Sequence, residues 1–147
     1  MKPKLLLRIG AILILIHGIL HTTGFSQWKQ DPDPAKHELI KLMTGQRYPF
    51  MGTTRNMGEY YDGFGYCSSV ALFMIAILLW LTSGEVATNP SLAKKVTLVI
   101  SLALVAWAVD EAIYFFPFAV SITLLAAACG FASLAQIAKQ QRPGGIS

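Results

Sequence analysis

Ionisable side chains lie inside apolar stretches of this sequence, at spacings that could support chemistry. His17 and His21 are four residues apart, so they share one face of a helix. Asp110 and Glu111 interrupt another apolar stretch near its end. Because a charge inside a bilayer is costly, such a group normally faces the interior of a helix bundle and has a partner there. These four residues are therefore the centre of a candidate site.

More candidates follow the same helical spacing at the start of the second apolar stretch and around the two acids of the third. Residues three and four apart on a helix are neighbours on its surface. The acidic and aromatic residues that share these faces are Glu59, Asp62, Tyr66, Trp107 and Tyr114.

The depths of these groups predict how they come together. At the rise of an α-helix, His17 and Asp110 both fall roughly 6 Å outside the midpoints of their stretches. His21 and Asp62 both fall roughly 12–13 Å outside. We expect a polar pocket with two layers, each holding an imidazole and a carboxylate, open to the outer side. Adjacent acids point about 100° apart on a helix, so Asp110 is favoured for the pocket because its depth matches His17. Glu111 would then face a neighbouring helix or another subunit of a homo-oligomer.

Some candidates also have ordinary structural explanations. Glu59 follows Asn56 by three residues, the spacing of a capping box at a helix start. Asp62 lies in the first turns of the same helix, where the macrodipole favours an acid. Asp110 and Glu111 have no such explanation, because the dipole opposes acids near a helix C-terminus.

Two kinds of function suit a pocket that combines carboxylates with aromatic rings. The first and favoured one is binding of a small amphipathic or lipid-like ligand, since aromatic rings and carboxylates accommodate an amine or a polar head. The alternative is acid–base catalysis on an apolar substrate, such as an isomerisation or a hydration. Asp110 or Glu111 would donate the proton, and His17 or His21 would orient or accept it. Transport is least favoured, because the ionisable groups stop halfway across the bilayer.

A metal site is a further alternative. His17 and His21 form an H-x-x-x-H pair, and together with Asp62 and Asp110 they are ligand types that suit zinc or non-haem iron. The motif alone is weak, because it lacks the glutamate of H-E-x-x-H.

The elements that must position these residues are membrane-spanning helices. The chain is 54% hydrophobic and only 14% charged, whereas soluble proteins are about a quarter charged. A spanning helix needs roughly 20 mostly apolar residues. Residues 1–147 are expected to form one all-α, polytopic membrane domain, a bundle of four transmembrane helices. The expected spans are residues 5–22, 60–81, 96–116 and 118–138.

The distribution of charge predicts the orientation. Lys2, Lys4 and Arg8 lie at the start of the first stretch, and Lys94 and Lys95 precede the third. Basic residues at the ends of apolar stretches are typical of membrane proteins, and a nucleic-acid partner is not expected. The bias places both termini on the cytoplasmic side of the inner (plasma) membrane, with residues 23–58 as an outer loop.

The loop of residues 23–58 is expected to contain a short amphipathic helix over residues 34–44. Asp33 is a good N-cap, Pro34 suits the first helical position and Gly45 suits the stop. A helix with one apolar face would lie on the membrane surface. It is either a lid over the pocket or, as we favour, a surface anchor.

Two motifs carry a resemblance to a known group of proteins. They are Tyr60-Tyr61-Asp62-Gly63-Phe64-Gly65-Tyr66 and Tyr114-Phe115-Phe116-Pro117, together with the histidine-bearing first stretch. With these, the chain resembles an uncharacterised family of small four-helix bacterial integral membrane proteins, which implies the fold and no activity. In architecture it is loosely similar to emopamil-binding and sigma-2-receptor-like proteins, small bundles with intramembrane acids that face sterol-like or amine ligands. Function does not follow from such a likeness of fold.

Overall fold

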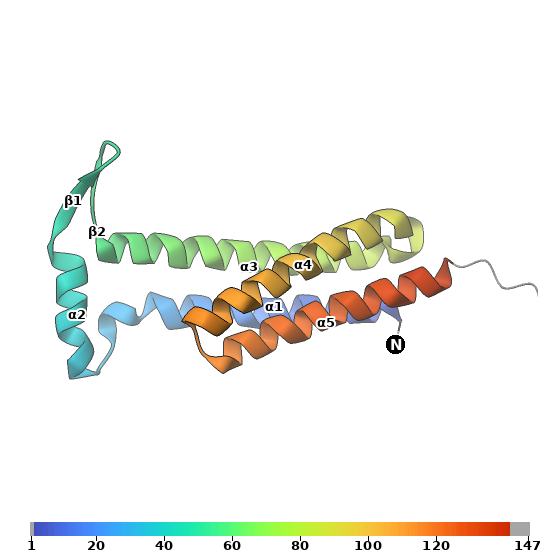
Figure 1. Cartoon of the computed structure of the whole chain (residues 1–147), viewed down its shortest axis with the longest axis horizontal. Helices are drawn as coiled ribbons and strands as arrows, with labels where there is room; N and C mark the ends of the chain where they lie inside the picture. The colour runs from blue at the N-terminus through green and yellow to red at the C-terminus, as the bar shows by residue number, and fades with distance from the viewer. Residues whose placement is uncertain (1, 142–147) are drawn as a thin grey trace, which may run out of the picture. The chain divides into compact units, whose positions relative to one another are not determined.

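A computed structural model of the chain describes residues 2–141, and residues 142–147 at the C-terminal end lie outside the described part. Four of its helices are long and apolar enough to cross a membrane. They are α1 (Pro3–Ser26), α3 (Met57–Thr88), α4 (Pro90–Tyr114) and α5 (Pro117–Gln140), drawn in Figure 1. The predicted all-α, multi-pass membrane architecture is confirmed.

The described residues form two compact units. One contains the chain up to His17 and from Leu72 onward, and the other is Gly18–Ala71. The boundary passes through α1 and α3, so each of these helices contributes to both units. That the whole chain acts as a single domain stays a prediction.

The helices are longer than the sequence predicted, and the expected loop of residues 82–95 is mostly helical. Only Asn89 separates α3 from α4. The side chain of Asn89 accepts a hydrogen bond from the backbone N–H of Leu92 at 3.1 Å, and Pro90 takes the first helical position. This N-cap with a proline allows a sharp turn directly between two helices. At the other end, α4 stops at Tyr114 because Phe115 is extended and Pro117 starts α5.

The larger unit has an apolar core to which all four long helices contribute. Its buried members are Leu7, Ala11, Ile14, Leu72, Ala76, Leu79, Ile100, Leu104, Ala126 and Ala127. Small residues are common among them, as expected where helices approach closely within a membrane. A polar contact also connects α5 to the start of α1, because the hydroxyl of buried Ser133 donates to the carbonyl of Pro3 at 3.2 Å.

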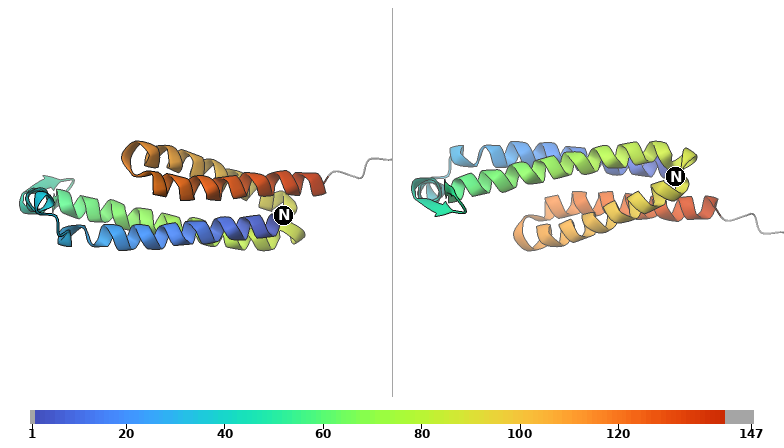
Figure 2. Two further views of the ribbon diagram at one scale, coloured as in Figure 1. Left: turned by 90° about the horizontal axis from the view of Figure 1, so that it is seen from below. Right: turned by 90° about the horizontal axis from the view of Figure 1, so that it is seen from above.

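The pair α4 and α5 is the tightest packing in this unit, and the two helices run antiparallel side by side in Figures 1 and 2. Gly130 of α5 lies directly against the side chain of Ser101 of α4, leaving no room for a Cβ atom. Both residues are on the buried faces of their helices. A glycine at this point lets the two backbones approach, which is the usual role of small residues in membrane helices.

The smaller unit holds the connection between α1 and α3. It contains a 3-10 turn (Trp28–Gln30), helix α2 (Pro34–Gly45) and a hairpin of strands β1 (Arg47–Phe50) and β2 (Thr53–Asn56). Helix α2 has the predicted start, because the Asp33 carboxylate accepts from the N–H of Ala35 at 3.0 Å. The Lys36 ammonium donates to Asp31 at 2.6 Å, and this hydrogen bond lowers the pKa of the Asp31 carboxyl.

The hairpin was not predicted. Its strands are antiparallel, with Arg47 opposite Asn56 and Phe50 opposite Thr53. The turn residues are Met51 and Gly52, both with positive φ. The usual two-residue turns of this kind are Asn-Gly or Asp-Gly. Here the glycine is present, but Met51 takes the place of Asn or Asp, so the sequence did not indicate a hairpin turn.

The close contact at Gly130 yields a first prediction. Gly130→Ala should lower the free energy of unfolding in detergent by about 1–3 kcal/mol, because the new methyl group overpacks the α4–α5 interface. Ser101→Ala in the same chain should recover part of that loss by removing the hydroxyl. Gly84→Ala is the control, since nothing lies within 4 Å of a Cβ atom there. Equal stability of the Gly130 and Gly84 variants would contradict this packing.

Candidate functional site

A buried polar contact joins α1 to α4 within the larger unit. Nε2 of His17 lies 3.3 Å from Oε1 of Glu111, and Nδ1 of His17 lies 3.1 Å from the hydroxyl of Thr123 on α5. His17 is 7% exposed and Glu111 is 3% exposed. Each ionisable side chain of the pair thus has a partner inside the apolar environment, where an unpaired charge would be costly.

The pairing corrects the choice between the two neighbouring acids. Asp110, which was expected to meet His17, is exposed on α4, and Glu111 is turned inward. The position along α4 expected from helical rise differs by one residue from the observed partner of His17. Helical rise does not determine the direction in which a side chain points. The direction follows from the buried stripe of α4, in which Thr97, Leu104 and Ala108 share a face with Glu111.

The second oxygen of the Glu111 carboxyl group does not take part in the contact with His17. This Oε2 atom is buried and has no hydrogen-bond partner among residues 2–141, as is also true of the hydroxyls of Thr97 and Ser101. A buried polar atom without a partner is costly. These three atoms follow the same buried face of α4, so the interior of this unit is more polar than its apolar sequence indicates.

Glu59 is occupied by the local structure, as its alternative explanation predicted. The backbone N–H of Asn56 donates to the Glu59 carboxylate at 2.9 Å, and the N–H of Glu59 donates to the Asn56 side chain at 2.8 Å. This reciprocal pair is a capping box. Arg47 of the hairpin adds a salt bridge to the same carboxylate at 3.2 Å. Glu59 therefore fixes the hairpin to the start of α3.

Asp62 is also held by neighbours in its own unit. The indole N–H of Trp28 donates to its carboxylate at 2.8 Å, and the ammonium group of Lys29 pairs with the other oxygen. The Trp28 ring packs edge-on against Tyr61, with ring centroids 5.0 Å apart. Asp62 thus ties the turn after α1 to the first turns of α3.

His21 and Tyr66 meet through the ring of Phe25. His21 stacks on Phe25 at 5.4 Å, and Tyr66 contacts Phe25 edge-on at 4.9 Å. A ring nitrogen of His21 is 3.2 Å from the carbonyl oxygen of Gly65. Gly65 is required here, because a Cβ atom would collide with the Phe25 ring. These contacts fasten the end of α1 to α3.

The predicted two-layer pocket divides between the two units. His17 and Glu111 belong to the larger unit, and His21, Glu59, Asp62 and Tyr66 belong to Gly18–Ala71. Of the two aromatic candidates on α4, Trp107 packs against the core of the larger unit and Tyr114 is 73% exposed. A single pocket holding all these groups stays a prediction.

The geometry gives the metal hypothesis no support. Within residues 2–141, no three His, Cys, Asp or Glu side chains form a group that could hold an ion. The H-x-x-x-H histidines have separate neighbours, since His17 meets Glu111 and His21 meets the Gly65 carbonyl. Of the other proposed ligands, Asp62 is bound to Trp28 and Lys29, and Asp110 is exposed on α4.

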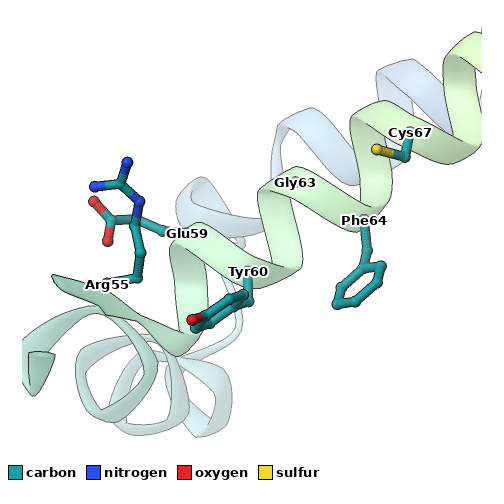
Figure 3. Close-up of a pocket in the computed structure, with 6 residues that line it drawn as sticks. All are labelled: Arg55, Glu59, Tyr60, Gly63, Phe64 and Cys67. Atoms are coloured by element: carbon teal, nitrogen blue, oxygen red, sulfur yellow. The ribbon is translucent and has the colours of Figure 1, made fainter. Parts of the chain in front are cut away.

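A pocket lies elsewhere, along the first turns of α3 in the smaller unit. It has a volume of about 220 Å³ and is lined by Arg55, Glu59, Tyr60, Gly63, Phe64 and Cys67. Figure 3 shows the charged groups of Arg55 and Glu59 at one end of this row, with Phe64 and Cys67 toward the other. The residues from Tyr60 onward follow three-and-four spacing, so they form one stripe along the helix.

The two cations beside this pocket differ in their contacts. Arg47 bonds to the Thr54 carbonyl and pairs with Glu59. Arg55 donates a long hydrogen bond of 3.4 Å to the Thr54 carbonyl, and its charge acts on the Glu59 carboxylate without a close ion pair. Neither Arg55, which lies outside the expected spans, nor Cys67, which reads as a small packing residue, was among the predicted site residues. The sequence does contain a feature that could have indicated the pocket. Tyr60, Gly63, Phe64 and Cys67 follow helical spacing, and the small residues Gly63 and Cys67 leave space beside the two aromatic rings.

Comparisons with models of protein families, with curated proteins and with solved structures found no match to this chain. The resemblance to the uncharacterised four-helix family therefore lacks support, and so does the looser likeness to emopamil-binding proteins. Function must be inferred from the contacts of the chain itself.

The pairing of His17 generates a second prediction. Glu111→Ala should lower the free energy of unfolding by about 3–5 kcal/mol, because removing one member of a buried pair leaves the other unsatisfied. The neighbouring variant Asp110→Ala is the matched control and should change stability by less than about 0.5 kcal/mol, as is usual for an exposed site. Denaturation in mixed micelles measures both. A larger loss in the Asp110 variant would restore the original assignment.

Proposed function

We propose that this membrane protein binds an amphipathic, lipid-like molecule in the pocket along the first turns of α3. The observation that supports this is that the two ends of the pocket differ, with charged groups at one end and apolar surface at the other. The polar head would lie beside Arg55, and the apolar part would lie over Gly63 between Tyr60 and Phe64. Membrane lipid is the most abundant molecule of this kind around a multi-pass protein.

The charges favour a ligand with an anionic head. Glu59 is a single carboxylate beside two guanidinium groups, because Arg47 forms a salt bridge with it and the charge of Arg55 also acts on it. The polar end of the pocket therefore carries an excess of one positive charge. A guanidinium group can hold a phosphate or carboxylate with two parallel hydrogen bonds. An amine, which was one of the heads considered from the sequence, is therefore less suitable here than the head of a phospholipid or a fatty acid.

Filling the pocket should remove the ligand. Gly63→Leu places a side chain in open space, since no atom lies within 4 Å of a Cβ atom at this position. Phospholipid retained by the purified protein, counted by mass spectrometry after extraction, should fall about tenfold, equivalent to about 1.4 kcal/mol of binding.

Gly84→Leu is the matched control, because Gly84 is on the same helix and is equally open. It should retain lipid like the wild type. An equal loss from both variants would mean that the retained lipid is general annular lipid, and no loss from either would exclude this pocket as the site.

We also propose the finer localisation that the charge pattern predicts, with both termini on the cytoplasmic side of the plasma membrane. Gln30→Cys, in a chain with Cys67→Ala and Cys129→Ala, should react with an impermeant thiol reagent added to intact cells. Thr88→Cys in the same background should react only after permeabilisation, because Thr88 is at the opposite end of α3. The reverse pattern would invert the topology.

A second candidate function is acid–base catalysis by the buried pair of His17 and Glu111. The observation that favours it is the Glu111 Oε2 atom, which has no hydrogen-bond partner among the described residues. A substrate group reaching this oxygen could exchange a proton with the carboxyl group, while His17 holds the other oxygen. Glu111→Gln would then abolish turnover and leave lipid retention at the α3 pocket unchanged. Loss of lipid retention in that variant would argue against separate sites.

A further inference from the structure

The turn of the hairpin has a backbone conformation that its sequence does not favour. Met51 has φ 46° and Gly52 has φ 81°, so both turn residues are in the left-handed region. Glycine adopts this region readily, but a residue with a long side chain does so rarely. Turns of this type normally use Asn, Asp or Gly at the first position. A non-glycine residue in such a conformation is a reason to look for a function.

Among residues 2–141, the side chain of Met51 is one of the most exposed apolar groups. It is 87% exposed, and the adjacent Phe50 is 59% exposed. Outside the four spans, helix α2 also presents apolar side chains, with Leu39 55% and Leu42 73% exposed. The turn thus projects an apolar side chain at a position where a polar residue would fit the backbone better.

The pairing of the two strands shows which side chains are on the same face of the hairpin as Phe50. Directly opposed residues of an antiparallel pair have their side chains on the same face. Tyr48 is opposite Arg55 and Phe50 is opposite Thr53, and all four share one face because residues two apart on a strand do so. Arg55 also lines the pocket beside Tyr60 and Phe64. The aromatic face of the hairpin is therefore on the side of the hairpin that adjoins the apolar part of α3.

The segment is close to the bilayer at both of its ends. Helix α1 ends at Ser26 and α3 starts at Met57, and both are long enough to span a membrane. Figure 1 shows α2 running across the end of α3, and Figure 2 shows α2 nearly end-on, so this helix is transverse to the spanning helix. A transverse helix at the end of a span lies along the membrane surface.

We propose that the tip of the hairpin inserts into the headgroup region of the bilayer, with Phe50 and Met51 as an apolar wedge. Arg55, on the same face as Phe50, would contact lipid phosphate. The occupant is thus a bilayer containing anionic phospholipid. Apolar side chains near a basic group are the usual means by which a segment attaches to such a surface. This attachment does not require a ligand in the α3 pocket.

A spin label distinguishes insertion from exposure to water. Phe50→Cys is labelled with a nitroxide in the Cys67→Ala, Cys129→Ala chain, reconstituted in vesicles of phosphatidylcholine and phosphatidylglycerol. Its relaxation should be enhanced more by oxygen, which partitions into lipid, than by a water-soluble nickel complex. Thr54→Cys is the matched control on the opposite face of the hairpin, and there the nickel complex should dominate. Equal dominance of the nickel complex at both positions would overturn the proposal.

A second variant tests Met51 itself. Met51→Gly suits the positive φ, so the hairpin should persist while its wedge becomes smaller. The oxygen accessibility of the label at position 50 should then fall toward that at position 54. An unchanged value would mean that Met51 has no part in insertion. Dipolar broadening between labels at position 50 would show that a second copy, rather than lipid, covers the tip, and would also refute the proposal.

Discussion

The structure depends on one constraint, which is that the interior of a bilayer supplies no hydrogen-bond partner for a polar side chain. An ionisable group that is buried among the apolar helices therefore needs its partner within the protein. His17 and Glu111 satisfy this constraint for each other across α1 and α4. Asp62 satisfies it with Trp28 and Lys29 near the end of α1. These pairs fix the register of the helices that carry them.

The same constraint separates structural polar groups from those available to a ligand. Glu59 was a candidate for chemistry, but its capping box and its salt bridge to Arg47 use both carboxylate oxygens. Arg55, on strand β2, also acts electrostatically on the Glu59 carboxylate, so two guanidinium groups surround one acid. Arg55 borders apolar surface at Tyr60 and Phe64. This excess of one positive charge beside an apolar stripe would suit the anionic amphiphile proposed above.

Sequence reasoning succeeded where the signal was local. The N-cap of α2 at Asp33 and the capping box of Glu59 each depend on residues within three positions, and both are present. It failed between Asp110 and Glu111, because helical rise gives depth while the inward direction depends on how α4 packs on α5. It missed the hairpin because Met51 replaces the expected turn residue. The packing of distant segments and an unusual turn are not encoded in any short window of sequence.

The central claim is that one particular stripe of α3 holds a lipid-like molecule. The most direct test is photo-crosslinking of the wild-type protein with a phosphatidylglycerol that carries a diazirine on its acyl chain, followed by peptide mapping. The account predicts adducts concentrated on residues 60–67 and displaced by excess unlabelled phosphatidylglycerol. Adducts spread evenly over the exposed faces of all four spans, and not displaced by competitor, would contradict it.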